Sequence, residues 1–139
     1  MDYTIRKLNS NDYESFLQLI NDFRETNFSQ TEFIEILNKI NINSDIWVIE
    51  HNSKLVTTGT VIYETKFIHN LGICAHIEDI CVKESYRKQG LGKIMMNHLI
   101  TEAKTKNSYK IILDCSHGLE SYYSKFGFYN HGIQMSQYT

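Results

Sequence analysis

The chain has 139 residues, of which 42% are hydrophobic and 22% charged, as is typical of one folded domain with its own core. Its formal net charge of −2 argues against general nucleic-acid binding, which needs a basic surface. Its apolar runs are too short to span a membrane, and its start, MDYTIRKL, has no apolar signal stretch. We therefore expect one cytoplasmic domain over residues 1–139, with no membrane partner and with three reduced cysteines.

The first third of the chain predicts a strand and two helices. Residues 3–8 alternate in polarity as in a strand, and apolar side chains recur through residues 13–23 at the spacing of one helix face. Ser29 and Glu32 have the spacing of a capping box, which predicts the start of a second helix. The side chains that this helix would turn inward are Phe33, Ile36, Leu37 and Ile40.

The rest of the chain reads as a mixed α/β (α+β) sheet. Three strands are predicted over residues 46–50, 55–65 and 73–82, and the apolar last of these is interrupted by two acids, Glu78 and Asp79. A helix over 91–104, a strand over 110–113, a short helix near 119–126 and a last strand over 127–135 follow. An antiparallel run that ends in a βαβ unit predicts a mixed, mostly antiparallel sheet flanked by helices.

A basic, glycine-containing turn lies between the strand over 73–82 and the helix that follows it. The segment Arg87-Lys88-Gln89-Gly90-Leu91-Gly92-Lys93 joins flexible glycines to a helix start, where free backbone N–H groups suit a pyrophosphate. It fits neither a Walker loop nor a complete dinucleotide fingerprint. A surface turn that happens to contain glycines is the alternative interpretation.

The pattern R-x-x-G-x-G in this turn resembles the acetyl-CoA pyrophosphate loop of the GNAT acetyltransferase superfamily. The segments HIEDICV (76–82), QGLGK (89–93), YKIILDC (109–115) and YYSKFGF (122–128) are similar to the glucosamine-6-phosphate N-acetyltransferases within it. This resemblance runs almost without gaps from about residue 57 to 135. It implies a GNAT fold whose sheet splays at the central strand, with acetyl-CoA lying in the splay as the acetyl donor.

The resemblance also implies an activity: the amine of glucosamine 6-phosphate attacks acetyl-CoA directly in a ternary complex. Tyr123 would serve the departing thiolate, and Asp114 would place the amine. Each has a structural alternative, because Tyr123 lies on an apolar helix stripe and Asp114 is placed to cap a loop. The residues that the resemblance assigns to acetyl-CoA are Ile80, Cys81, Val82, Arg87, Lys88, Gln89, Gly90, Leu91, Gly92, Lys93 and Tyr123.

The resemblance assigns a further set of residues to the amino sugar and its phosphate. Glu78 and Asp79 are neighbours, so they face one pocket only if the strand bulges. Lysines 66 and 110 have the common alternative of solvated surface residues, and Thr26 is a possible further match. The residues assigned to the substrate are Lys66, Phe67, Ile68, His69, Glu78, Asp79, Ile80, Tyr109, Lys110 and Asp114.

Two departures from the family pattern bear on the substrate. Tyr138 stands near the place of an arginine that assists the phosphate, and residues 117–120 replace a segment that usually lacks glycine. Relatives are intertwined homodimers, so we expect a dimer with shared sites. No metal-ligand spacing is visible, and a cysteine nucleophile lacks a partnering histidine. The alternatives are a GNAT enzyme for another amine, small or on a protein, and a non-catalytic acyl-CoA-binding module.

Overall fold

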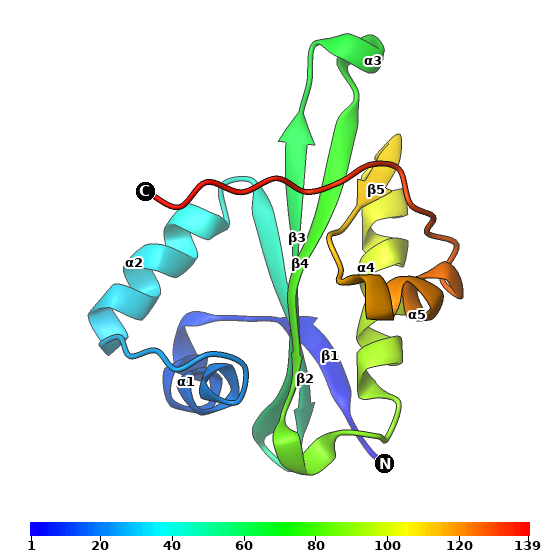
Figure 1. Ribbon diagram of the computed structural model, residues 1–139. Coiled ribbons are helices and arrows are strands. Elements are labelled where there is room, and N and C mark those ends of the chain that lie inside the picture. Colours follow the sequence, from blue (N-terminus) through cyan, green and yellow to red (C-terminus); the bar gives the residue numbers. More distant parts are fainter.

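The computed structural model describes residues 1–139 as a mixed sheet between two helical layers (Figure 1). Helices α1 and α2 cover one face of the sheet, and α4 and α5 cover the other. The predicted mixed α/β fold is confirmed. The strands are β1 (Thr4–Lys7), β2 (Ser44–His51), β3 (Lys54–Thr65), β4 (Ile73–Val82) and β5 (Lys110–Ile112). The helices are α1 (Tyr13–Asn21), α2 (Gln30–Ile40), α3 (Ile68–Leu71), α4 (Leu91–Thr105) and α5 (Glu120–Ser124), with short 3-10 turns at Ser10–Asp12, Glu84–Tyr86 and His117–Leu119.

The five strands lie in the sheet in their chain order. Strands β1 to β4 pair antiparallel, and β5 joins β4 in parallel through the crossover helix α4. The β3–β4 hairpin is the longest pair, and its tip, which carries α3, projects beyond the body of the molecule (Figure 1). None of the helices combines the length and apolar character needed to cross a bilayer.

Strand β4 both bulges and loses its neighbour half-way along. Strand β5 pairs with β4 only from Cys74 to His76, so the edge of β4 from Ile77 onward has no strand beside it. On the β3 side, Thr58 pairs with Cys81 and Thr60 with Glu78, which leaves two residues of β4 opposite one of β3. The extra residue is Asp79, at φ 52°. The predicted bulge and splay are both confirmed.

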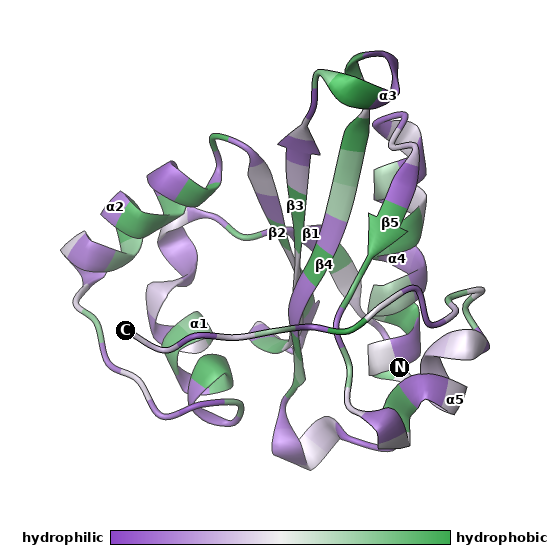
Figure 2. Ribbon diagram, turned by 45° about the horizontal axis from the view of Figure 1, so that its top comes forward, coloured by the Kyte–Doolittle hydropathy of each residue, from purple (hydrophilic) through white to green (hydrophobic).

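Two apolar clusters hold the helices to the sheet. In Figure 2 hydrophobic positions alternate with hydrophilic ones along the helices of both layers, as expected where one side of each helix packs on the sheet. The larger cluster joins α4 to the sheet around Met95 and Leu99, and the other joins α1 and α2 to it. The capping box of Ser29 and Glu32 at the start of α2 is confirmed. The prediction that Ile36 points inward is wrong, because α2 packs through Phe33 and Leu37 and leaves Ile36 50% exposed.

The predicted last strand, Gly127–Met135, is wrong. After Gly127, at φ 95°, the chain is extended but pairs with no strand, and it crosses the sheet from the α5 side to the α2 side (Figures 1 and 2). Ile133 and Met135 are 82% and 86% exposed. The alternation of the sequence marks an extended segment, but strand formation also needs a partner, which this chain does not provide.

Candidate functional site

A phosphate-binding geometry stands at the start of α4. Gly90 has the left-handed φ of 82°, which suits glycine, and α4 follows without a side-chain cap. The first N–H groups of the helix are therefore free for a ligand, and the helix dipole favours an anion there. Lys88, Gln89 and Lys93 are exposed around this turn.

The start of α4 and the free edge of β4 adjoin each other at Gly92. A side chain placed there would meet the Val82 Cγ2 at 3.7 Å and the Tyr122 hydroxyl at 3.8 Å. These are ordinary van der Waals distances, so the helix start and the end of β4 lie side by side at Gly92. The N–H of Lys83 donates to the Val56 carbonyl of β3, so by alternation the backbone groups of Val82 face the free edge. Tyr122 was missed in the sequence, where it reads only as part of an apolar stripe.

The side chains of two residues expected to bind acetyl-CoA form hydrogen bonds within the chain. The resemblance assigns Cys81 to the donor through its backbone. The Cys81 side chain is buried and its thiol donates to the Leu19 carbonyl at 3.6 Å, so only its backbone is available. The Arg87 side chain turns back toward β4, where Nε donates to the Val82 carbonyl at 3.1 Å. The remaining positive charges of the turn are those of Lys88 and Lys93.

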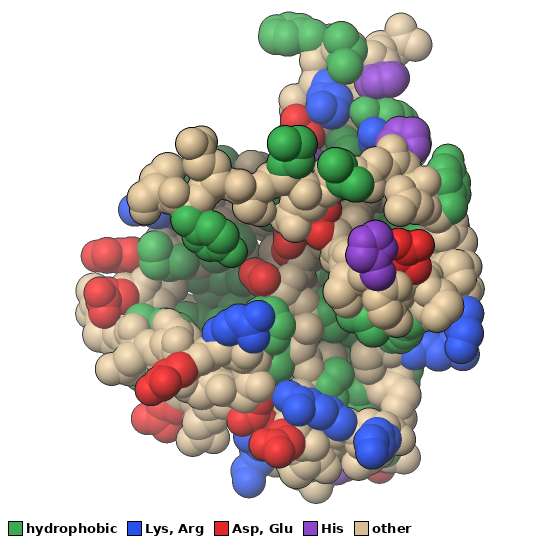
Figure 3. All heavy atoms as spheres, viewed as in Figure 1, with side chains coloured by type: hydrophobic (Ala, Val, Ile, Leu, Met, Phe, Trp, Pro, Cys, Tyr) green, Lys and Arg blue, Asp and Glu red, His purple; other side chains and the backbone are tan.

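An acidic cavity of about 520 Å³ lies on the α1–α2 side of the bulge. The bulge brings Glu78 and Asp79 to the same cavity, although they are neighbours in sequence. In this region of Figure 3 acidic side chains gather beside a hollow in the surface. Burial raises the pKa of Glu78, and the carboxylates of Asp79 and Asp114 raise it further. The other lining residues are Phe16, Ile20, Thr26, Phe28, Ile40, Ser44, Ile46, Thr58, Thr60 and Ile62.

Most of this lining could not be found from the sequence. It comes from α1, α2, β2 and β3, whose side chains read simply as core or strand residues. Thr26 is the one lining residue outside Glu78 and Asp79 that the sequence suggested, and the structure places it in the cavity wall.

The two expected catalytic side chains lie on segments that follow β5. Asp114 is exposed, accepts a hydrogen bond from Gln134 Nε2 at 3.2 Å and is close enough to raise the pKa of Glu78. Tyr123 is half-buried and packs against the α4 core. The Tyr122 ring meets it edge-on, with the two ring centroids 5.0 Å apart. Burial raises the pKa of Tyr123, and Tyr122 and Cys115 raise it further. Its hydroxyl therefore stays protonated at neutral pH and can donate a hydrogen bond.

Ile80, also expected to bind the substrate, packs against the α4 core. The other expected substrate residues form a separate group at the hairpin tip. The His69 ring stacks on the Tyr109 ring with the ring centroids 4.3 Å apart, and Lys110 Nζ lies 5.8 Å from the centroid of the same Tyr109 ring. Lys66 pairs with Glu64 at 3.0 Å. Phe67 and Ile68 beside them are 93% and 64% exposed. None of these residues lines the acidic cavity of their own chain.

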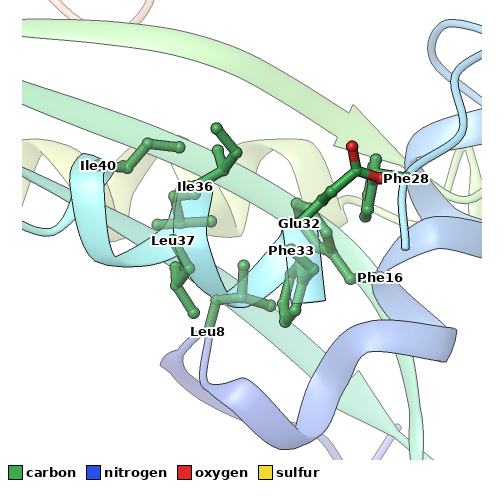
Figure 4. Close-up of a pocket in the computed structure, with 9 residues that line it drawn as sticks. Leu8, Phe16, Phe28, Glu32, Phe33, Ile36, Leu37 and Ile40 are labelled. Carbon is green, nitrogen blue, oxygen red and sulfur yellow. The ribbon is translucent and has the colours of Figure 1, made fainter. Parts of the chain in front are cut away.

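Two further features of the molecule resemble binding sites. Glu64, Cys74 and His76 hold potential metal ligands within 4.8 Å of one another, but the Glu64 carboxylate is already engaged by Lys66 and His76, and we assign no metal to them. A smaller cavity of about 140 Å³ lies under α2 (Figure 4). Its lining is apolar apart from Glu32, so it offers almost nothing to bind a polar substrate.

Comparison with known proteins identifies the family. Residues 13–128 match the model of the acetyltransferase (GNAT) family. The chain belongs to this GNAT family. It is 34% identical to glucosamine 6-phosphate N-acetyltransferase 1 of Dictyostelium discoideum, over 97% of this chain and 90% of that protein.

Solved structures of this GNAT fold superpose closely on the chain. The crystal structure of glucosamine-6-phosphate N-acetyltransferase from Arabidopsis thaliana has a TM-score of 0.91 and 35% identity, with 99% of each chain covered. A Trypanosoma brucei acetyltransferase has a TM-score of 0.94 and 30% identity, covering 99% of this chain and 100% of that one.

Proposed function

We propose that this GNAT protein transfers the acetyl group of acetyl-CoA to the amine of glucosamine 6-phosphate. The observation that carries the proposal is the meeting of two half-sites at the β4 bulge: a phosphate cradle with a free strand edge, and an acidic cavity. Relatives matched over nearly the whole chain are named for this reaction. The product would feed UDP-N-acetylglucosamine synthesis in the cytoplasm.

The donor is held mainly by backbone. The pyrophosphate lies on the free N–H groups at the start of α4, with Lys88 and Lys93 adding charge. The pantetheine arm runs along the β4 edge and accepts backbone hydrogen bonds in the manner of an added strand. This arrangement brings the thioester to the bulge, where Asp79 and Ile80 are freed from regular pairing with β3.

The acceptor amine enters from the acidic cavity. Carboxylates of Glu78, Asp79 and Asp114 attract the ammonium form, and Glu78, whose pKa is raised, accepts its proton. The neutral nitrogen then forms a bond to the thioester carbon, and the carbon–sulfur bond breaks. Tyr123 donates a proton to the departing thiolate. The attacking nitrogen loses its second proton as it becomes an amide nitrogen, and this proton restores the Tyr123 hydroxyl. No covalent enzyme intermediate is needed.

The phosphate of the sugar needs positive charge that the cavity lacks, since no lysine, arginine or histidine lines it. The hairpin tip carries Lys66, His69 and Lys110 away from the cavity of its own chain, beside exposed Phe67 and Ile68. We propose a homodimer in which the tip of one chain completes the cavity of the other. The unpaired last segment, with Ile133 and Met135 exposed, supports the same assembly.

Free thiol release from acetyl-CoA tests the proposed reaction. Purified protein would be assayed with glucosamine 6-phosphate and, in parallel, with glucosamine, a polyamine and a peptide amine. Fast release with the phosphorylated sugar alone is expected. Release with another amine alone would contradict the proposed substrate, and acetyl-CoA binding without release to any amine would indicate a binding module instead.

The absence of a basic side chain from the cavity lining favours one second candidate, a GNAT enzyme for an amine without phosphate. Lys66→Ala distinguishes the two functions. If the tip serves the phosphate, this variant raises KM for glucosamine 6-phosphate and leaves KM for glucosamine unchanged. An equal effect on both sugars, or none, would favour the second candidate.

A further inference from the structure

Asp22, one residue beyond the end of α1, is tied to the turn that precedes α4. Its side-chain Oδ2 accepts a hydrogen bond from the Glu84 N–H at 2.9 Å, and its carbonyl accepts one from Arg87 Nη2 at 3.2 Å. The same Arg87 side chain donates through Nε to the Val82 carbonyl at 3.1 Å. The segment from Val82 to Arg87 is thus held at both ends and in the middle, partly by a residue more than 60 positions away in the chain.

The helix that supplies Asp22 also forms a wall of the acceptor cavity. Phe16 and Ile20 of α1 line this cavity, and the Leu19 carbonyl receives the thiol of Cys81 from β4. One helix therefore contacts the acidic cavity along its length and the donor turn at its end. Any shift of the donor turn relative to the cavity would have to break the bonds to Asp22.

The charge of Asp22 is unfavourable for a direct role in donor binding. A carboxylate beside a phosphate-binding turn repels the phosphates of the donor. The two guanidinium nitrogens of Arg87 that form hydrogen bonds are directed at carbonyl oxygens of Val82 and Asp22. The Asp22 and Arg87 side chains thus bind backbone groups of the turn and of the end of α1. The N–H groups at the start of α4, together with Lys88 and Lys93, remain available to bind the pyrophosphate.

We propose that Asp22 and Arg87 are positioning residues that fix the turn over residues 82–87, so that the start of α4 faces the donor. This inference rests on the proposed use of acetyl-CoA. From charge alone, removing the Asp22 carboxylate from beside the phosphate site should strengthen acetyl-CoA binding. The positioning role predicts the opposite, that removing the Asp22 side chain weakens acetyl-CoA binding.

The test measures the Kd of acetyl-CoA by calorimetry at fixed ionic strength. Asp22→Ala is expected to raise Kd by about three- to tenfold, the loss of roughly one hydrogen bond. Asp22→Asn keeps an acceptor for the Glu84 N–H and should stay within about twofold of the unchanged protein. Glu25→Ala, which removes the same charge from an exposed neighbouring position, is the matched control and should not weaken binding.

Two readouts separate positioning from a general loss of structure. KM for S-acetylpantetheine, which lacks the pyrophosphate, should be unchanged in Asp22→Ala. The effects of Asp22→Ala and Arg87→Ala should be less than additive, because both act on one network. Binding by Asp22→Ala as tight as that of the unchanged protein, or additive effects, would overturn the inference alone. No acetyl-CoA binding by the unchanged protein would overturn the proposed function as well.

Discussion

Replacing Glu78 with glutamine should separate catalysis from stability. The substitution keeps the size of the side chain and its place in the cavity, but it removes the carboxylate that we propose as the acceptor of the amine proton. Burial and the carboxylates of Asp79 and Asp114 raise the pKa of Glu78, so its ionised form is disfavoured in the folded state. Because the pKa of Glu78 is higher in the folded than in the unfolded state, its protonated form stabilises the fold. This stabilisation is complete below the ordinary glutamate pKa of about 4.3, and it is lost as pH rises through the pKa of the folded state. At neutral pH, Glu78→Gln should therefore unfold no more easily than the unchanged protein.

The same substitution should lower kcat/KM by about 10²- to 10⁴-fold, the usual contribution of a positioned general base. The unchanged enzyme should also lose kcat/KM as pH falls through the raised pKa of Glu78, and this acidic limb should be missing from the residual activity of Glu78→Gln. Thiol release measured over a pH series, with urea unfolding in parallel, checks both parts. A variant that keeps more than about a tenth of kcat/KM and the same pH profile would refute Glu78 as the base.

Three other substitutions test different parts of the structure. Tyr123→Phe should lower kcat by about tenfold or more with the Kd of acetyl-CoA unchanged, and Tyr129→Phe, at an exposed position outside the site, is its control in a stopped-flow and calorimetric comparison. Gly59→Ala would place a Cβ 2.9 Å from Leu99 Cδ1 and 3.0 Å from Met95 Cγ, so urea unfolding should show a loss of about 1–3 kcal/mol, and an unchanged midpoint would contradict this packing. Burial lowers the pKa of His98, so stability should fall as pH drops through the ordinary histidine pKa of about 6.5, and His98→Phe should flatten this decline between pH of about 8 and 5.

The elements that the sequence predicted are those fixed by local pattern. The capping box at Ser29 and the apolar spacing of α4 depend on residues three or four positions apart, and both helices form where expected. The bulge was expected from the family resemblance and not from local pattern. Two adjacent acids face one pocket only if the strand bulges, but an acid pair in a strand can also be solvated at its edge. The turn before α4 was found because glycine and basic residues concentrate within a few positions.

The features that the sequence did not reveal depend on contacts between distant segments. Asp22 carries no motif, and its role exists only because α1 ends beside the turn at Glu84. The cavity wall likewise takes Phe16 from α1 and Ser44 from β2, which look like ordinary helix and strand residues. The wrong strand over 127–135 has the same cause, because alternation reports an extended backbone and says nothing of whether a neighbouring strand is present.

The bulge in β4 explains how one strand can serve two substrates on opposite sides. A regular strand would direct Glu78 and Asp79 to opposite faces and would keep its edge groups in register with a neighbour. The extra residue turns both acids into one cavity, and the early end of β5 leaves the adjoining edge free for the donor. The proposed acceptor and donor half-sites therefore meet at the stretch of β4 where pairing is interrupted on both sides. Gly59, packed against Leu99 and Met95 opposite the bulge, lets α4 approach closely enough for its first turn to reach the same place.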